Sequence, residues 1–198
     1  IMYVPCTTVR TGLAKRAPVG YDGHSAARAA HAGREERAMF SETLICVGKL
    51  KEKFYLSAAA EYTKRLGGLC AFQLIELPEV RLPDNPSQAE IAQALAKEAA
   101  SIRAKVPKGS WLCVLAIEGR ELSSQALAAQ LDAVRQSGKS SACFVIGSSF
   151  GLDASLKASA DFRLSMSPMT FPHHLARVMA LEQLYRAESI LAGTKYHK

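Results

Sequence analysis

Apolar segments of two kinds alternate from Met39 onward, and this alternation restricts the fold more than any other feature. Short runs without a polar residue, at 111–117 and 142–146, are typical of strands buried on both faces of a parallel sheet. Segments whose apolar residues recur every three or four positions lie between them and indicate helices. The pattern predicts an α/β domain with a mainly parallel sheet and helices on both faces.

The limits of the expected elements follow from turn and capping residues. Gly67 and Gly68 are placed to end the first helix, and Ser87 with Glu90 has the spacing of a capping box that begins the second. Glu118 and Gly119 are expected to close the third strand. The expected strands are residues 43–47, 71–77, 111–117, 142–146 and 162–166, and the clearest helices are 51–66 and 173–191.

Residues 1–38 differ from the rest of the chain. They carry six basic and three acidic residues and show no sustained apolar period. We therefore expect residues 39–198 to be the folded domain, with the extension disordered or outside the mature fold. The extension is either sequence upstream of a start at Met39 or an organelle transit peptide. The first alternative predicts a cytoplasmic protein, the second an organellar one, and in both the extension is dispensable for folding.

Composition excludes several classes of protein. No apolar run approaches the roughly 18 residues that a membrane span needs, so no membrane partner is expected. No two of the five cysteines have C-x-x-C spacing, so no metal site is expected; Cys46, Cys113 and Cys143 lie in apolar runs typical of buried free thiols. The formal charge of +7 suits a polyanionic partner without proving one.

Ligands of parallel α/β sheets bind outside the carboxyl ends of the strands, which here means the loops after Ile117, Ile146 and Met166. The segment from Gly147 to Gly151 follows a buried strand, and its glycines allow a close approach of the backbone to a ligand. It is neither a G-x-G-x-x-G fingerprint nor a P-loop. The simpler interpretation is a plain turn from strand to helix.

The last helix carries an acid and a base on an apolar face. Glu182 and Arg186 share that face with Leu175, Val178, Met179, Tyr185 and Ile190. They form either a mutual salt bridge or a polar site at an interface. Leucines on the opposite side leave the helix apolar on two sides, which indicates a second subunit. The loop before this helix, 167–172, is unusually apolar and is a candidate to cover a ligand.

The chain resembles the RlmH family of SPOUT methyltransferases, which methylate N3 of a pseudouridine in large-subunit ribosomal RNA. The resemblance covers Met39 to Lys198, about the family's whole length. The matching pieces are Leu44 to Gly48, Glu61-Tyr62, Arg65-Leu66, Val145-Ile146-Gly147, Gly151-Leu152, Phe171-Pro172-His173, Arg177-Val178, Glu182, Leu184-Tyr185-Arg186-Ala187 and Tyr196-His197-Lys198.

The resemblance implies a C-terminal trefoil knot, S-adenosylmethionine as cofactor, 23S ribosomal RNA in the ribosome as substrate, and a homodimer in which one subunit's tail completes the other's site. Glu182 would orient Arg186 toward a phosphate or base edge, and Tyr196 and His197 would contact the base. The implied cofactor contacts are Leu115 and Gly119 after the third strand, then Gly147, Ser148, Gly151, Met166, Ser167, Pro168, Met169, Thr170 and Phe171.

The chain departs from the family at two positions of the glycine loop. Ser148 stands where the family usually has glycine, and Phe150 stands where it has a small or acidic residue. A serine does not readily take the positive φ that glycine permits, which bears on the affinity for the cofactor. Two other functions remain open: a SPOUT methyltransferase that acts on transfer RNA, and a ribosome-associated RNA binder without catalytic activity.

Overall fold

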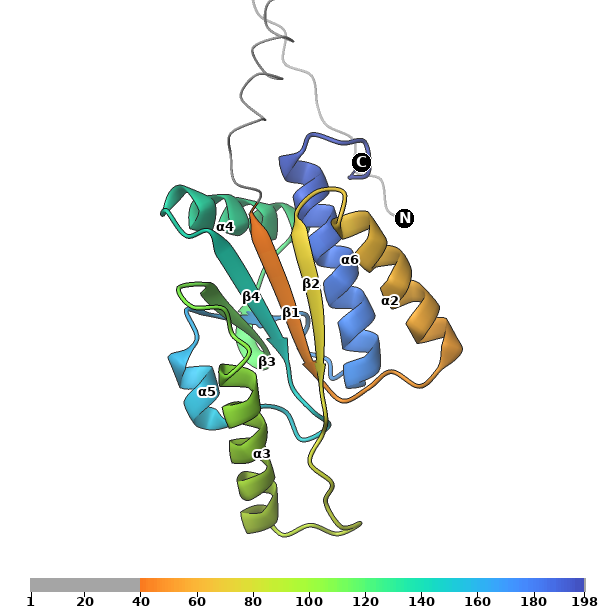
Figure 1. Ribbon diagram of the computed structural model, residues 1–198, viewed down its shortest axis with the longest axis vertical. Coiled ribbons are helices and arrows are strands. Elements are labelled where there is room, and N and C mark those ends of the chain that lie inside the picture. The colour runs from red at the N-terminus through yellow and green to blue at the C-terminus, as the bar shows by residue number, and fades with distance from the viewer. Residues whose placement is uncertain (1–39, 198) are drawn as a thin grey trace, which may run out of the picture. The chain divides into compact units, whose positions relative to one another are not determined.

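The computed structural model describes residues 40–197, in which five parallel strands form one sheet in the order β2-β1-β4-β3-β5 (Figure 1). The predictions for residues 1–38 lie outside this part of the chain. The elements are β1 (Ser41–Val47), α2 (Lys53–Leu66), β2 (Ala71–Leu77), α3 (Gln88–Arg103), β3 (Trp111–Glu121), α4 (Ser124–Gln136), β4 (Ser141–Ile146), α5 (Ala154–Ser159), β5 (Phe162–Ser165) and α6 (His173–Leu191).

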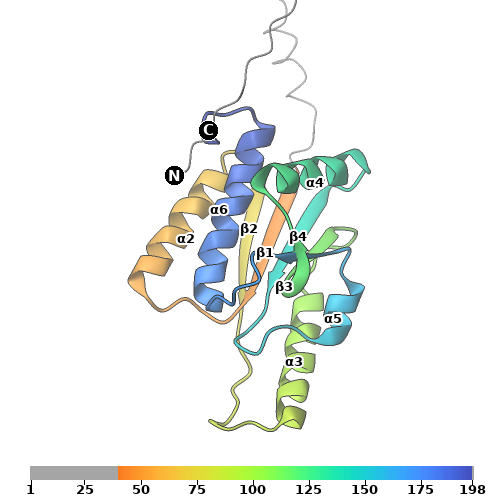
Figure 2. The same ribbon diagram turned by 180° about the vertical axis from the view of Figure 1, so that it is seen from behind.

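Helices cover both faces of the sheet, as the alternation of segments predicts. Leu44 and Phe144 pack with residues of α2, α4 and α6 in one core, whereas Ile45 and Val145 pack with residues of α3 and α5 in the other. Neighbouring residues of a strand thus face opposite cores, which explains the unbroken apolar runs. In the reverse view of Figure 2, α6 lies between α2 and α4.

Local signals place most element boundaries correctly. Ser87 caps α3 by accepting a hydrogen bond from the Glu90 backbone N–H, and the Glu90 side chain accepts one from the Ser87 N–H. The capping box is therefore confirmed. The four described cysteines are free and buried, which confirms the expectation for Cys46, Cys113 and Cys143. In residues 40–197, no helix is both long and apolar enough to cross a membrane.

The predicted end of the third strand is wrong. Strand β3 continues to Glu121, and both Leu115 and Arg120 pair with Leu164 because the register with β5 shifts between them. Gly119 lies inside this irregular stretch, where a Cβ would sit 2.7 Å from the Arg163 carbonyl oxygen. Leu115 and Gly119 therefore belong to β3 itself, and glycine permits the close approach of β3 to β5.

Candidate functional site

A cavity of about 130 Å³ opens at the carboxyl ends of β4 and β5, beside the middle of β3 and the N-terminus of α6. Its position is the one expected for ligands of a parallel sheet. It is lined by most of the predicted cofactor residues: Leu115, Gly147, Ser148, Gly151, Met166, Ser167, Met169, Thr170 and Phe171. Gly119 and Pro168 do not line it. The loops after β4 and β5 thus meet at the cavity as predicted, whereas its third side is formed by residues 115–117 within β3 and not by a loop.

The glycine turn after β4 is closed by its own backbone. The Gly151 N–H donates to the Ser148 carbonyl oxygen over 2.9 Å, and Gly151 has a φ of 89°. A Cβ on Gly147 would lie 2.1 Å from the Gly151 carbonyl oxygen. Gly147 is therefore required by the turn itself, and not only by the space next to a ligand.

The two departures from the family pattern are accommodated. No residue other than glycine in the described part of the chain has a positive φ, so Ser148 takes an ordinary backbone conformation. Its hydroxyl donates to Glu98 Oε2 over 2.8 Å, and Ser149 Oγ donates to Glu79 Oε1 over 2.7 Å. Phe150 is half exposed and does not line the cavity. Both serines therefore anchor the turn.

The cavity suits part of a cofactor of the size of S-adenosylmethionine. Pockets for small molecules usually measure about 300–1,000 Å³, more than this cavity. A second cavity of about 440 Å³ lies beside it, between the start of α4 and the middle of α6. The two share Leu115, Leu164, Ser165 and Met166 among their lining residues, so they adjoin one another. The apolar lining and the glycine turn fit an adenosine group.

His173 also lines the smaller cavity, although no role was predicted for it beyond the family match. Burial, with a smaller contribution from the neighbouring His174, lowers the pKa of His173 below its ordinary value of 6.5, which favours the neutral imidazole at pH 7. A neutral imidazole can both donate and accept a hydrogen bond.

The four residues predicted to be catalytic meet at the other end of α6. Arg186 pairs with Glu182 through Nε, at 2.9 Å from Oε1, and Tyr196 donates to the same carboxylate over 3.1 Å. His197 Nδ1 lies 3.4 Å from Arg186 Nη1, and its Nε2 lies 2.8 Å from Gln125 Nε2. The mutual salt bridge is thus confirmed, and the short tail folds back onto α6.

Glu182, Arg186, Tyr196 and His197 form the tail cluster, and the protonation states of two of them follow from their pKa shifts. The hydrogen bond to Glu182 raises the pKa of Arg186, and burial raises the pKa of Tyr196 to about 12. At neutral pH, Arg186 is therefore a cation and Tyr196 a hydrogen-bond donor. The Arg186 guanidinium lies 4.8 Å from the centre of the Tyr196 ring. Such a cluster offers both a charge for phosphate and flat surfaces for a base.

The tail cluster and the smaller cavity are separated along α6. Glu182 in the cluster lies nine residues after His173 at the cavity, which corresponds to about 13.5 Å of helix. A methyl group cannot be transferred over that distance.

The sequence alone did not indicate that Arg177 holds several elements together beside the site. Its side chain is fully buried, pairs with Glu76, and donates from Nη2 to the Gly48 carbonyl oxygen over 2.7 Å. It joins the start of α6 to the ends of β1 and β2. The only sequence signal was a base within an apolar stretch of α6, which does not reveal its partners.

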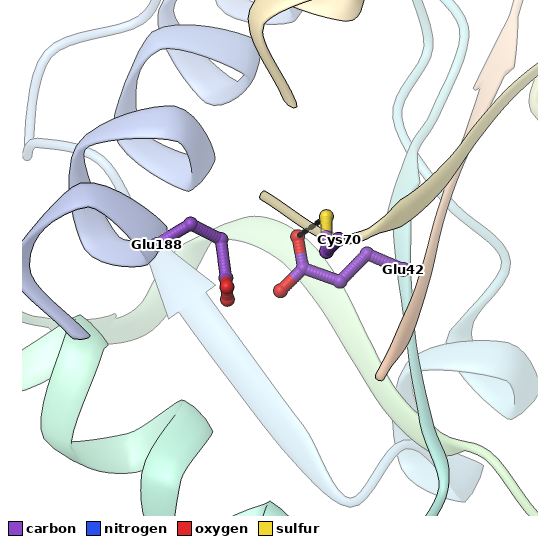
Figure 3. A group of neighbouring side chains, drawn as sticks. All are labelled: Glu42, Cys70 and Glu188. Carbon is purple, nitrogen blue, oxygen red and sulfur yellow. Dashed lines mark hydrogen bonds between the residues drawn. The ribbon is translucent and has the colours of Figure 1, made fainter. Parts of the chain in front are cut away.

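A further cluster of polar side chains lies inside the core, away from both cavities. Figure 3 shows Glu42, Cys70 and Glu188 pointing toward one another, with Cys70 Sγ 3.8 Å from Glu42 Oε2. Three such ligands can hold a metal ion, but Arg135 already pairs with Glu188 and lies 3.9 Å from Glu42 Oε1. One guanidinium faces two carboxylates, so a proton suffices to balance the charge.

Glu42→Gln is expected to stabilise the protein at alkaline pH. Burial and the neighbouring Glu188 raise the pKa of Glu42 well above its ordinary value of 4.5. Stability from its protonated form is present below that ordinary value and is lost as the pH rises through the raised pKa. Glutamine keeps the neutral form, so its advantage should grow with pH to about 1–2 kcal/mol.

Urea unfolding at pH 5 and pH 8.5 measures this effect. The control is Glu61→Gln, which removes an exposed carboxylate paired with Arg65 and should show almost no dependence on pH in this range. If Glu42→Gln were equally destabilising at both values, Glu42 would be ionised in the folded protein.

Known proteins provide an independent comparison. Residues 41–197 match the family described as "Predicted SPOUT methyltransferase". The chain is 44% identical to "Ribosomal RNA large subunit methyltransferase H" of Acetivibrio thermocellus over 79% of this chain and 98% of that protein. It is 42% identical to the protein of the same name from Leuconostoc mesenteroides over 78% of this chain and 98% of that protein.

Solved structures also resemble the chain. A probable methylase family protein from Haemophilus influenzae Rd KW20 is 16% identical, with a TM-score of 0.47 over 80% of this chain and 70% of that one. The match to the family spans the whole described domain, and both relatives align over nearly their full length. The chain therefore belongs to the RlmH family of SPOUT methyltransferases.

Proposed function

We propose that this protein transfers a methyl group from S-adenosylmethionine to N3 of a pseudouridine in 23S ribosomal RNA, in the assembled ribosome. The observation that carries the proposal is the cavity at the strand ends, which all predicted cofactor residues except Gly119 and Pro168 line. Two relatives above 40% identity bear the name of a large-subunit ribosomal RNA methyltransferase. The net charge of +7 suits an RNA substrate.

The residues of the chain position the reactants. The cofactor supplies the methyl group on a sulfonium, a good leaving group. The turn from Gly147 to Gly151 and the loop after β5 hold it at the strand ends. Arg186, oriented by Glu182, binds a phosphate or a base edge, and Tyr196 and His197 contact the base. The geometry assigns no general base for the N3 proton.

A homodimer explains the separation between the tail cluster and the cavity. The half-buried face of α6 carries Leu175, Val178 and Met179 next to Glu182 and Arg186. If this face packs against a second copy, the tail cluster of one subunit can reach the cavity of the other. Light scattering should then give twice the mass of one chain at micromolar concentration.

The path of the chain after β4 is consistent with the trefoil knot of this family. From β4 the chain passes beyond β3 to form β5 at the sheet edge, then returns as α6 on the face that carries α2 and α4.

The proposal also covers domain organisation and location. Residues 39–198 form the methyltransferase domain, and the protein acts in the cytoplasm. An organellar location is the alternative if residues 1–38 are a transit peptide.

Methylation of intact ribosomes tests the proposed function. Purified protein and labelled S-adenosylmethionine are mixed with ribosomes, free 23S RNA or transfer RNA, and the modified nucleotide is mapped. We expect label at one pseudouridine of 23S RNA, and most of it with assembled ribosomes. Label on transfer RNA alone would mean that the protein is a SPOUT methyltransferase that acts on transfer RNA. Ribosome binding without methylation or cofactor binding would indicate a non-catalytic binder.

A further inference from the structure

Glu98 is a buried carboxylate directly behind the glycine turn. It lies on α3 with 5% of its surface exposed. Its Oε1 accepts a hydrogen bond from the Val80 backbone N–H over 2.9 Å, and its Oε2 accepts one from Ser148 Oγ over 2.8 Å. The carboxylate thus connects the segment after β2 with the turn that follows β4.

This carboxylate lacks the cation that the other buried acids have. Three glutamates are buried in residues 40–197, and two of them, Glu42 and Glu188, face Arg135. Within the same residues, no lysine, arginine or histidine forms an ion pair with Glu98. Burial of a charge without a partner is costly, and two hydrogen bonds offset only part of the cost. The surroundings of Glu98 would be stabilised by one further positive charge.

The cavity next to Glu98 can receive that charge. Ser148 lines the cavity, and its hydroxyl donates a hydrogen bond to Glu98, so the lone pairs of the hydroxyl oxygen are left to accept from or face another group. S-adenosylmethionine has a positively charged sulfonium, whereas its product S-adenosylhomocysteine has a neutral thioether. In a site of low dielectric, a nearby carboxylate favours the charged form.

We propose that Glu98 is a positioning residue that acts through Ser148 and makes the cavity prefer the sulfonium cofactor over its thioether product. The proposal rests on the proposed function, because it requires S-adenosylmethionine in this cavity. The same preference assists turnover: once the methyl group has left, the ligand no longer carries the charge that Glu98 attracts, and the product dissociates more readily.

Calorimetry with both ligands tests the role of Glu98 without a reaction. Glu98→Gln removes the charge at almost constant shape. We expect it to weaken S-adenosylmethionine binding about tenfold and S-adenosylhomocysteine binding by less than about threefold. The matched control is Glu61→Gln, which removes an exposed carboxylate on α2 that does not line the cavity, so both affinities should stay unchanged.

A second variant covers the case in which Glu98→Gln does not fold. Ser148→Ala keeps the buried carboxylate and removes the hydroxyl between it and the cavity, so it should reduce the ratio of the two affinities in the same direction. If both variants lost affinity for the two ligands by the same factor, the role of Glu98 would be overturned and the proposed function would remain intact. If the unmodified protein bound neither ligand, the proposed function itself would fail.

Discussion

Gly147→Val should abolish measurable binding of S-adenosylmethionine. The first atom of any side chain at this position would lie 2.1 Å from the Gly151 carbonyl oxygen and 2.6 Å from its carbonyl carbon. Carbon atoms in contact normally keep about 3.5–4.0 Å apart, so the turn must open. Because the same turn forms one wall of the cavity, we expect a loss of roughly a hundredfold or more in affinity.

The comparison with a second glycine separates this effect from general damage. Gly67 ends α2 with a φ of −60°, and a Cβ there would come no closer than 3.5 Å to another atom. Gly67→Ala should therefore bind the cofactor like the unmodified protein. Calorimetry measures the affinity, and circular dichroism shows whether each variant is folded. An unchanged affinity in folded Gly147→Val would mean that the cofactor binds elsewhere.

Ending the chain at Lys195 should lower the methylation of ribosomes by roughly a hundredfold or more, while cofactor affinity and the proposed dimerisation are retained. The truncation removes the Tyr196 hydroxyl that binds Glu182 and the imidazole beside Arg186 and Gln125. None of these groups lines the cofactor cavity. Tyr196 also packs on Tyr185 with ring centres 4.6 Å apart, so a small loss of thermal stability is expected.

Lys195→Ala serves as the control for the truncation, because this exposed side chain adjoins the tail cluster without belonging to it. It should lower activity only a few-fold. Initial rates at several ribosome concentrations separate a loss of binding from a loss of turnover. A truncated protein with full activity would show that the tail cluster does not act on the substrate.

Mixed dimers test whether the tail acts across the subunit interface. One inactive variant lacks the tail and the other carries Gly147→Val. If the tail of one subunit serves the cavity of its partner, a heterodimer contains one complete site and regains activity. Heterodimers that form but stay inactive would mean that each tail serves its own subunit, or that the two sites depend on each other.

The architecture could be predicted from local patterns. Parallel strands buried on both faces must be apolar throughout, and the helices between them must carry one apolar stripe. The spacing of apolar residues therefore predicts the order of strands and helices. The capping box at Ser87 and the glycine turn at Gly147 are short-range features for the same reason. Because ligands bind at the carboxyl ends of such strands, the loops after β4 and β5 were also predictable, whereas the individual cofactor residues were implied by the family resemblance.

The end of β3 could not be predicted. Glu118 and Gly119 look like a strand terminus, yet β3 continues to Glu121 because β5 pairs with it on both sides of the register shift. Whether a glycine ends a strand or lets another backbone approach depends on what lies beside it. That neighbour, Arg163, is more than forty residues later in the chain.

Periodicity by itself determined the α/β fold and the loops after β4 and β5 that meet at the cavity, since both depend on residues close in sequence. Only the tertiary structure decided the environment of the buried charges. Glu98 meets Ser148 fifty residues away, and Arg177 meets Glu76 at a separation of 101. A charged residue in a helix looks the same in sequence whether water or another chain segment surrounds it, and the free energy of a charge depends on that difference.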